Sequence, residues 1–210
     1  MTMNRTRLVL PVTGVVLASV AITACGGSTG SGGSGGPAGS SRTAPSSPAA
    51  PATESNPPGD IPDNQAYVAF APSGGGFSVK VPEGWARTGK GTVTSFTDKL
   101  NRVELAPVTA ASAPTTGSVT AQTVPRLRRT VPNFAPGKVS VVARHAGQAV
   151  LLTYQGDSAP DPVTGKVVRD SFERYAFYRQ GHEVDVTLSG PVNADNVDPW
   201  RIVTDSFTWQ

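Results

Sequence analysis

The sequence predicts an α+β fold, an antiparallel β-sheet flanked by helices, behind a signal peptide and a disordered tether. Three observations support this prediction. An apolar segment follows two arginines at the N-terminus, as in export signals. Residues 26–64 consist largely of Gly, Ser, Pro and Ala, a composition that buries no core. From Ala66 onward, several segments alternate apolar and polar residues, as half-buried strands do. The expected parts are therefore 1–24, 25–65 and 66–210.

The first part has the features of a lipoprotein signal peptide. Arg5 and Arg7 precede the apolar stretch Leu8–Ile22, which is short for a membrane span. The stretch ends in Ile22-Thr23-Ala24-Cys25, which resembles the bacterial lipobox, whose cysteine receives a diacylglyceryl group. Cys25 is the only cysteine in the chain and has no disulfide partner within it. We expect a lipid anchor on Cys25 that holds the product at the extracytoplasmic side of the cell membrane. An ordinary signal peptide with an incidental cysteine is the alternative.

The second part, residues 25–65, is expected to be a tether. Gly and Ser dominate its first half, and Pro, Ala and Ser its second, so it has too few apolar side chains to fold. Removal of the signal peptide takes away Arg5 and Arg7, which leaves 16 of the 18 basic residues against 15 acidic ones. This near-neutral balance does not indicate nucleic-acid binding.

The third part opens with the clearest strand. In Phe77–Val81 the apolar residues Phe, Val and Val alternate with Ser and Lys, which predicts a strand with one buried face. Pro82 cannot donate to a sheet and ends this strand, Gly84 allows a turn, and Trp85 is expected at the end of the core. Upstream, Tyr67–Ala71 is compatible with a strand or with a helical turn.

Six further strands are expected, and they form three hairpins. Each pair is separated by a short polar connection, which is typical of antiparallel neighbours. The expected pairs are Thr92–Asp98 with Arg102–Val108, Lys138–Arg144 with Ala149–Gln155, and Val167–Gln180 with Glu183–Ser189.

Two helices are expected to cover the sheet. The first spans Gly117–Val131 and is capped by Ser118. Pro125 within it indicates that its regular part is shorter than the pattern. One apolar stripe runs along it, formed by Val124, Leu127 and Val131.

The second expected helix lies near the C-terminus. It is entered at Asp198-Pro199, with Asp198 at the N-cap and Pro199 at the first helical position. Trp200, Val203 and Phe207 then share one side, which we expect to pack against the sheet.

These segments resemble Mog1/PsbP-like domains. Phe77–Trp85 looks like their opening strand, which begins with an aromatic residue and ends in Pro-x-Gly-Trp. The resemblance covers roughly Tyr67–Gln210 and implies an α/β/α sandwich around an antiparallel sheet. It implies no reaction, because members of this fold serve as assembly factors, binding modules or accessory subunits. Further stretches resemble uncharacterised actinobacterial lipoproteins of this kind: 161–166, 173–175, 189–191, 194–200 and 205–207.

Side chains suited to catalysis or metal binding are few, and we assign no catalytic residue, metal or cofactor. His145 and His182 fall in turns between strands, where solvated histidines need no special role. Asp157 and Asp161 share a loop, but this loop has neither the third oxygen ligand nor the glycine of a calcium loop. Glu183 and Asp185 are expected on opposite faces of their strand, which argues against a paired-carboxylate site.

Arg126, Arg128 and Arg129 form a basic cluster on the first helix. The simpler interpretation is a solvated face, whose cations suit a helix C-terminus. The alternative is contact with anionic lipid headgroups or an acidic partner. An aromatic set is expected in the core rather than around a ligand, namely Tyr154, Tyr175, Phe177, Tyr178, Trp200 and Phe207.

Three functional hypotheses follow. The first is a non-enzymatic, membrane-anchored binding or accessory module for an envelope protein, which the tether and the resemblance favour. The second is a carrier or sensor of an apolar ligand such as a lipid, which requires a closed apolar cavity between a helix and the sheet. The third is an envelope hydrolase, which requires His145 or His182 within hydrogen-bond reach of a Ser or Thr and a carboxylate.

Overall fold

The fold comes from a computed structural model, which describes residues 57–161 and 163–210. The expected signal peptide, Cys25 and most of the expected tether lie outside the described residues. The elements are β1 (Tyr67–Phe70), β2 (Phe77–Pro82), β3 (Ala86–Lys90), β4 (Val93–Asp98), β5 (Asn101–Thr109), α1 (Thr116–Ser118), the π-helical turn η1 (Val119–Thr123), α2 (Val124–Thr130), β6 (Ala135–Arg144), β7 (Gly147–Asp157), β8 (Arg169–Arg179), β9 (His182–Pro191), α3 (Val197–Asp205) and β10 (Thr208–Trp209).

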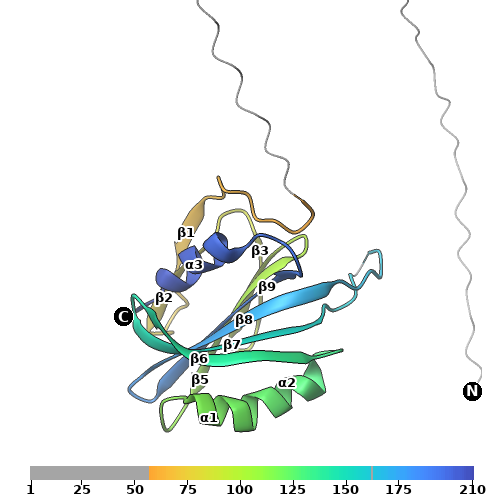
Figure 1. Ribbon diagram of the computed structural model, residues 1–210. Coiled ribbons are helices and arrows are strands. Elements are labelled where there is room, and N and C mark those ends of the chain that lie inside the picture. The colour runs from red at the N-terminus through yellow and green to blue at the C-terminus, as the bar shows by residue number, and fades with distance from the viewer. Residues whose placement is uncertain (1–56, 162) are drawn as a thin grey trace, which may run out of the picture. The chain divides into compact units, whose positions relative to one another are not determined.

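Seven strands form one antiparallel sheet in the order β3-β4-β5-β9-β8-β7-β6 (Figure 1). The three expected hairpins, β4–β5, β6–β7 and β8–β9, are confirmed by the strand pairing. β5 also pairs with β9, with Leu105 opposite Val186, and so joins the two halves of the domain's sequence. Short turns between neighbouring strands explain why the sheet is antiparallel.

One face of this sheet packs against α3 and a three-stranded sheet of order β1-β2-β10 (Figure 1). The expected strand at Phe77 is its central strand, β2, and Phe77 is fully buried. The ring of Phe207 stacks between Phe77 and Phe177, with centroid distances of 5.4 and 4.2 Å. Trp200 and Val203 of α3 join this core, as their spacing predicted.

The opposite face packs against the segment from α1 to α2 (Figure 1). The expected stripe of Val124, Leu127 and Val131 lies on a second core that contains Leu152 and Tyr154 of β7. The domain is therefore an α/β/α sandwich, with the large sheet as its middle layer.

The first helical segment differs from the single helix expected over Gly117–Val131. Its N-cap is Thr115 rather than Ser118: Thr115 Oγ1 accepts from the Ser118 N–H at 3.0 Å, and Ser118 Oγ accepts from the Thr115 N–H at 2.9 Å. The chain then passes through η1, where the Val124 N–H donates to the Val119 carbonyl. Because this π-helical bond ends one segment, Pro125 falls in the first turn of α2, where its missing N–H costs little.

Helix α3 also begins earlier than expected. Its N-cap is Asn196, so Asp198-Pro199 falls in the first turn. The Asn196 side chain makes no capping hydrogen bond to the helix and instead forms three long-range hydrogen bonds. Its Oδ1 accepts from the Ile61 N–H at 2.8 Å, and its Nδ2 donates to the Gly59 carbonyl and to Asn101 Oδ1, both at 3.0 Å.

The packed part of the chain starts upstream of Ala66, the boundary expected from composition. Ile61 is only 5% exposed and belongs to the core, and its backbone N–H donates a hydrogen bond to the Asn196 side chain. Two strands were not expected from the sequence. β3 is exposed throughout and therefore has no apolar alternation, and β10 is a two-residue extension beside β2.

None of the helices formed by residues 57–161 and 163–210 has the length and apolar character needed to cross a membrane.

Candidate functional site

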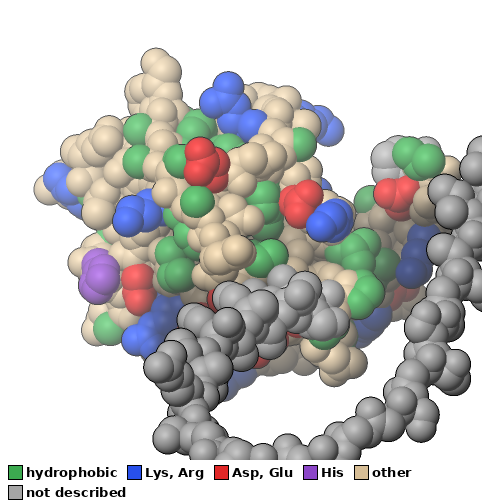
Figure 2. Space-filling view, turned by 90° about the horizontal axis from the view of Figure 1, so that it is seen from above, with side chains coloured by type: hydrophobic (Ala, Val, Ile, Leu, Met, Phe, Trp, Pro, Cys, Tyr) green, Lys and Arg blue, Asp and Glu red, His purple; other side chains and the backbone are tan. Residues whose placement is uncertain are grey.

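The surface seen in Figure 2, from above relative to Figure 1, mixes apolar and charged side chains in small groups. Large apolar side chains that are exposed on the described domain include Val68 at 42% and Val197 at 72%. Scattered apolar residues are ordinary on a soluble domain and mark no site by themselves. Hollows in the surface are therefore the better candidates.

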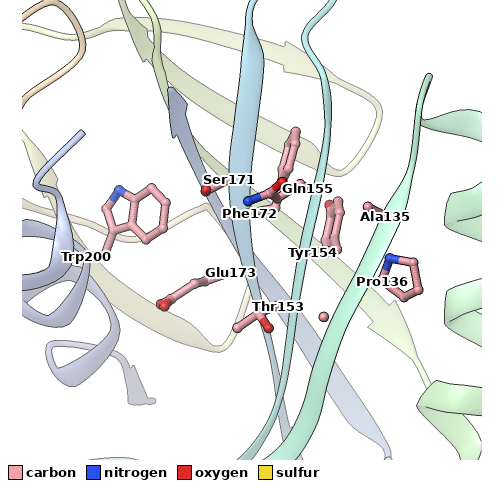
Figure 3. A pocket seen from close by; sticks show the side chains of 10 residues that line it. Ala135, Pro136, Thr153, Tyr154, Gln155, Ser171, Phe172, Glu173 and Trp200 are labelled. Atoms are coloured by element: carbon pink, nitrogen blue, oxygen red, sulfur yellow. The ribbon is translucent and has the colours of Figure 1, made fainter. Parts of the chain in front are cut away.

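A hollow of about 400 Å³ lies between Trp200 of α3 and the strands β6, β7 and β8 (Figure 3). Its charged group is Glu173, whose Oε2 already accepts from the Tyr175 hydroxyl at 2.7 Å. Trp200 is 8% exposed and packs mainly into the core. The charged and aromatic groups of this hollow are thus already engaged by the protein.

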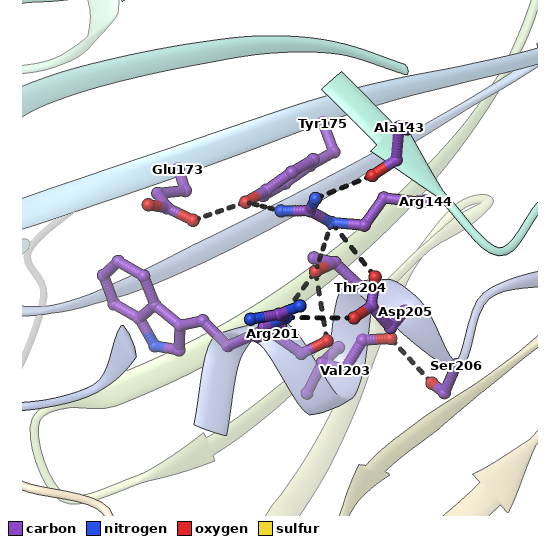
Figure 4. Close-up of polar contacts among 10 residues, drawn as sticks. Ala143, Arg144, Glu173, Tyr175, Arg201, Val203, Thr204, Asp205 and Ser206 are labelled. Atoms are coloured by element: carbon purple, nitrogen blue, oxygen red, sulfur yellow. Dashed lines mark hydrogen bonds and ion pairs between the residues drawn. The ribbon is translucent and has the colours of Figure 1, made fainter. Parts of the chain in front are cut away.

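The Glu173–Tyr175 contact belongs to a network that holds α3 on the sheet (Figure 4). Arg144 donates to the Tyr175 hydroxyl at 2.9 Å and to Thr204 Oγ1 at 3.1 Å, and it lies 3.5 Å from Asp205. Burial raises the pKa of Tyr175 to about 12, and the Glu173 carboxylate adds to the increase. Tyr175 therefore stays neutral and donates, which is a structural role.

A larger groove of about 750 Å³ lies at the C-terminal end of α2. Three segments far apart in the sequence form its walls: residues 130–132 at the end of α2, the β4–β5 turn, and the β7–β8 loop. Asp170 and Phe172 of β8 and Ser189 of β9 line it as well. Mixed apolar and polar walls of this size are typical of binding sites.

Asp170 is the unusual residue of this groove. It is only 4% exposed, and its Oδ1 is buried without a hydrogen-bond partner among the described residues. Burial raises the pKa of Asp170 to about 6, and the negative charge of Asp157 adds to the increase. Gly156 lies opposite Asp170 in the sheet, and a Cβ at Gly156 would lie 2.2 Å from Val131 Cγ1. Glycine at position 156 therefore allows Val131, which directly follows α2, to pack closely against the sheet beside Asp170.

The other two aspartates that line the groove already accept hydrogen bonds from neighbouring residues. Asp157 accepts from Asn133 Nδ2 at 2.6 Å and lies 3.3 Å from Arg169 Nη1. Asp161 Oδ1 accepts from the Thr164 N–H at 2.7 Å and its hydroxyl at 2.9 Å, and these bonds lower the pKa of Asp161. Asp157 and Asp161, which the sequence did not favour as calcium ligands, therefore order the loop.

A buried ionic cluster lies near the groove, on β8 and β9. Arg174 forms an ion pair with Asp185, and Arg174 Nη2 also lies 3.6 Å from Glu183 Oε1. The expectation that Glu183 and Asp185 lie on opposite strand faces is wrong, because side chains two residues apart on a strand point the same way. Burial raises the pKa of Glu183 to about 7, with a further increase from Asp185, while Arg174 and Arg126 oppose it. The sequence carries this signal, since Glu183 and Asp185 are two residues apart in a strand whose side chains alternate with a period of two.

The remaining candidates from the sequence are not brought together. His145 and His182 are both exposed, and no hydrogen bond joins either side chain to another of the described residues. Arg126, Arg128 and Arg129 are exposed on α2. Over residues 57–161 and 163–210, no group of three His, Cys, Asp or Glu side chains could hold a metal ion.

Five of the six expected core aromatics divide between the two cores. Tyr178 belongs to neither: it is half-buried, and its hydroxyl accepts from the Gly181 N–H at 3.0 Å. Tyr154 lies under α2 and stacks on Phe172 with a centroid distance of 4.5 Å. Tyr175, Phe177 and Phe207 lie under α3 and the small sheet. Their stacked rings occupy the space in which an apolar ligand would need a cavity, so the packing favours a core role.

Comparison with known proteins shows likeness in structure only, because no family model and no curated protein matches the chain. The solution structure of cyanobacterial PsbP, CyanoP, from Synechocystis is 12% identical with a TM-score of 0.51, and the match covers 70% of this chain and 94% of that one. The Ran-binding protein Mog1p of Saccharomyces cerevisiae is 8% identical with a TM-score of 0.47, covering 69% and 96%.

Two further matches also have TM-scores below 0.5. LpqN, involved in cell envelope biogenesis of Mycobacterium tuberculosis, is 13% identical with a TM-score of 0.37, covering 73% of this chain and 90% of that one. A Bacteroides thetaiotaomicron crystal structure is 10% identical with a TM-score of 0.47, and this chain spans about half, 48%, of its length. With TM-scores below 0.5 these two matches support no conclusion, and at 12% identity the likeness to CyanoP concerns the fold alone. The strand order, the two flanking layers and the likeness to CyanoP together show that residues 57–161 and 163–210 have a Mog1/PsbP-like fold.

Proposed function

We propose that this chain is a non-enzymatic, extracytoplasmic binding module, and that it binds part of an envelope protein in the groove at the end of α2. In this proposal, a lipid on Cys25 anchors the module to the cell membrane. The observation that carries the proposal is the 750 Å³ groove, whose lining includes a buried carboxylate without a partner in the described domain. A buried charge of this kind costs stability, so its presence at a surface groove favours a role in binding.

The expected tether suits this role. A random coil of about 40 residues spans on the order of 35 Å, so an anchored domain could reach proteins that stand out from the membrane. Because two acyl chains give a stable anchor, the module would remain close to partners in the same membrane. Confinement of this kind raises the effective concentration of a weak binding surface.

Site-specific photo-crosslinking in intact membranes tests the groove. A photo-reactive residue replaces Lys166, which lines the groove, or Lys90, which is exposed at the end of β3 and serves as the matched control. We expect one defined protein adduct from position 166, reduced by the groove variant Val168→Arg, and no such adduct from position 90. Equal adducts from both positions, or none from position 166, would contradict the proposal.

Membrane fractionation of a Cys25→Ala variant tests the anchor. Without the thiol no lipid can be attached, so we expect the variant to leave the membrane fraction while the wild type remains. A Cys25→Ala chain that is processed by the general signal peptidase and still sediments fully with membranes would contradict the anchoring on Cys25.

A further inference from the structure

We propose that Asp170 is the recognition residue of the groove and that it takes one ammonium or guanidinium group, the end of a lysine or arginine side chain presented by the partner protein. This inference rests on the proposed function, because it names the chemistry that the groove would recognise. The argument comes from the surroundings of Asp170, from the shape of the groove and from the charges at its rim.

The carboxylate of Asp170 is the group in the groove that most needs a partner. Its Oδ1 is buried and accepts no hydrogen bond from another described residue, whereas Asp157 and Asp161 are held by neighbouring donors. A buried carboxylate is stabilised strongly by a cationic donor, since charge-assisted hydrogen bonds gain strength where water is excluded. A neutral donor would satisfy the hydrogen bond but leave the charge uncompensated.

The walls of the groove suit the stem of a long basic side chain. Apolar side chains line the groove beside Asp170, contributed by Leu100, Val131, Pro132, Val168 and Phe172. Lysine and arginine bury their methylene stems along such surfaces while their charged ends reach a polar group. A volume of about 750 Å³ exceeds the needs of a single side chain, so part of the partner's backbone would enter as well.

The charges at the rim of the groove restrict which residues of the partner can flank its basic side chain. Lys99 and Lys166 line the groove, and neither forms an ion pair with another of the described residues. A polybasic segment would be repelled by these two lysines, whereas carboxylates beside the inserted residue would be attracted. The fitting partner therefore presents one lysine or arginine flanked by acidic residues.

A metal ion fits the groove less well than an organic cation. Calcium takes six to eight oxygen ligands, and the two neighbouring aspartates are engaged by Asn133 and by their own loop. No cluster of three metal-binding side chains occurs among the residues that the structure describes. One free carboxylate matches the single charge of an ammonium or guanidinium group.

Two probe peptides test the inference with the full chain in detergent micelles. One carries a single lysine flanked by two aspartates and has blocked ends; the other carries norleucine, an uncharged residue of similar length, in place of the lysine. Amide shifts in nuclear magnetic resonance spectra report binding. We expect saturable shifts in groove residues with the lysine peptide, and binding weaker by about tenfold or more with the norleucine peptide.

Matched variants locate the effect. Asp170→Asn keeps the size of the side chain but removes the charge, so it should weaken binding of the lysine peptide by about tenfold or more. Asp63→Asn, at an exposed position outside the groove, should leave binding unchanged. Equal affinity for the two peptides, an unaffected Asp170→Asn variant, or no saturable shift would overturn the inference. A crosslinked partner at position 166 together with any of those results would leave the proposed function standing and remove Asp170 alone.

Discussion

Arg174 on β8 and Asp185 on β9 form an ion pair almost withdrawn from solvent, with exposures of 5% and 7%. The pair is imperfectly satisfied, because Arg174 Nη1 and Asp185 Oδ1 are buried without further partners among the described residues. Removing two charges from water is costly, and their attraction offsets that cost only while both are present. The pair therefore makes the domain sensitive to the loss of either member.

We predict that Arg174→Met destabilises the domain by about 3–5 kcal/mol, because Asp185 is left as an uncompensated buried charge. Urea unfolding at neutral pH measures the change. The double variant Arg174→Met/Asp185→Leu should recover most of the loss, since it removes both members of the pair. An Arg174→Met variant as stable as the wild type would contradict the buried pairing.

The exposed pair Arg102–Glu104 provides a matched control. Its atoms lie 2.8 Å apart, closer than many surface pairs, but the two side chains are 49% and 34% exposed. Because water screens such a pair, Arg102→Met should cost less than about 1 kcal/mol. Equal losses for Arg102→Met and Arg174→Met would show that burial does not determine the cost.

Glu183 should make stability depend on pH near neutrality. Its pKa in the folded domain is about 7, above its ordinary value, with burial as the main cause. Folding therefore favours the protonated form, so the contribution to stability is present at low pH and is lost as pH rises from about 4.5 through 7. We predict that Glu183→Gln reduces the loss of stability between pH 5 and pH 8.

Unfolding midpoints of the wild type, Glu183→Gln and Glu83→Gln at both pH values test this prediction. Glu83 is exposed, so its variant should retain the wild-type difference. Three charged groups face Glu183, namely Asp185, Arg174 and Arg126, and each is unchanged in both variants. A Glu183→Gln variant with the wild-type pH dependence would show that Glu183 titrates at its ordinary pKa.

Asp170 should lower the stability of the domain at neutral pH. Its pKa of about 6 lies above the ordinary value because of burial and the charge of Asp157. Stability from this group is therefore present at acidic pH and is lost as pH rises from about 4 through 6. We predict that Asp170→Asn stabilises the domain at pH 7.5, by on the order of 1–3 kcal/mol, and changes it little at pH 4.

Thermal unfolding at the two pH values measures this effect, with Asp63→Asn as the control at an exposed position. The expected gain in stability accompanies the expected loss of peptide binding, which is the signature of a residue kept for function rather than for folding. An Asp170→Asn variant that is destabilised at both pH values would instead assign the carboxylate a structural role.

The sequence predicted the layers because their apolar residues repeat with a clear period. β2, β5, β9 and the stripe on α2 each place apolar side chains in a core at a regular spacing, so the period of two or of 3.6 reveals them. β3 has no buried residue and therefore no such pattern. The start of α3 was misplaced because Asp198-Pro199 is a good local cap, whereas Asn196 is held there by distant contacts.

The groove could not be predicted in the same way. Its walls come from three loops whose proximity depends on the pairing of β5 with β9 and on the seating of α2. Asp170 follows an arginine in an ordinary strand, and nothing local distinguishes it from a solvated aspartate. Val131, which lines the groove with Asp170, approaches the strand residue opposite Asp170 closely because that residue, Gly156, has no side chain. Tertiary contacts of this kind have no local periodicity.

Gly190 lies where two side-chain amides approach the backbone closely. A Cβ at this position would lie 2.4 Å from Asn101 Oδ1 and 2.8 Å from Asn196 Nδ2. These two amides bond to each other at 3.0 Å, and both donate to the Gly59 carbonyl. The contact joins the β4–β5 turn, which forms one wall of the groove, to the start of α3 and to the upstream segment.

We predict that Gly190→Ala destabilises the domain by about 1–3 kcal/mol, because the methyl group must displace one of the two amides from a buried contact. Gly89→Ala is the matched control, since a Cβ there meets only the Val93 carbonyl at 3.9 Å. Urea unfolding measures both variants, and the control should stay within about 0.5 kcal/mol of the wild type. Because Asn101 also lines the groove, the lysine peptide should bind Gly190→Ala more weakly than Gly89→Ala. Equal stability of the two variants would show that the amides move apart without cost and that Gly190 does not hold this wall in place.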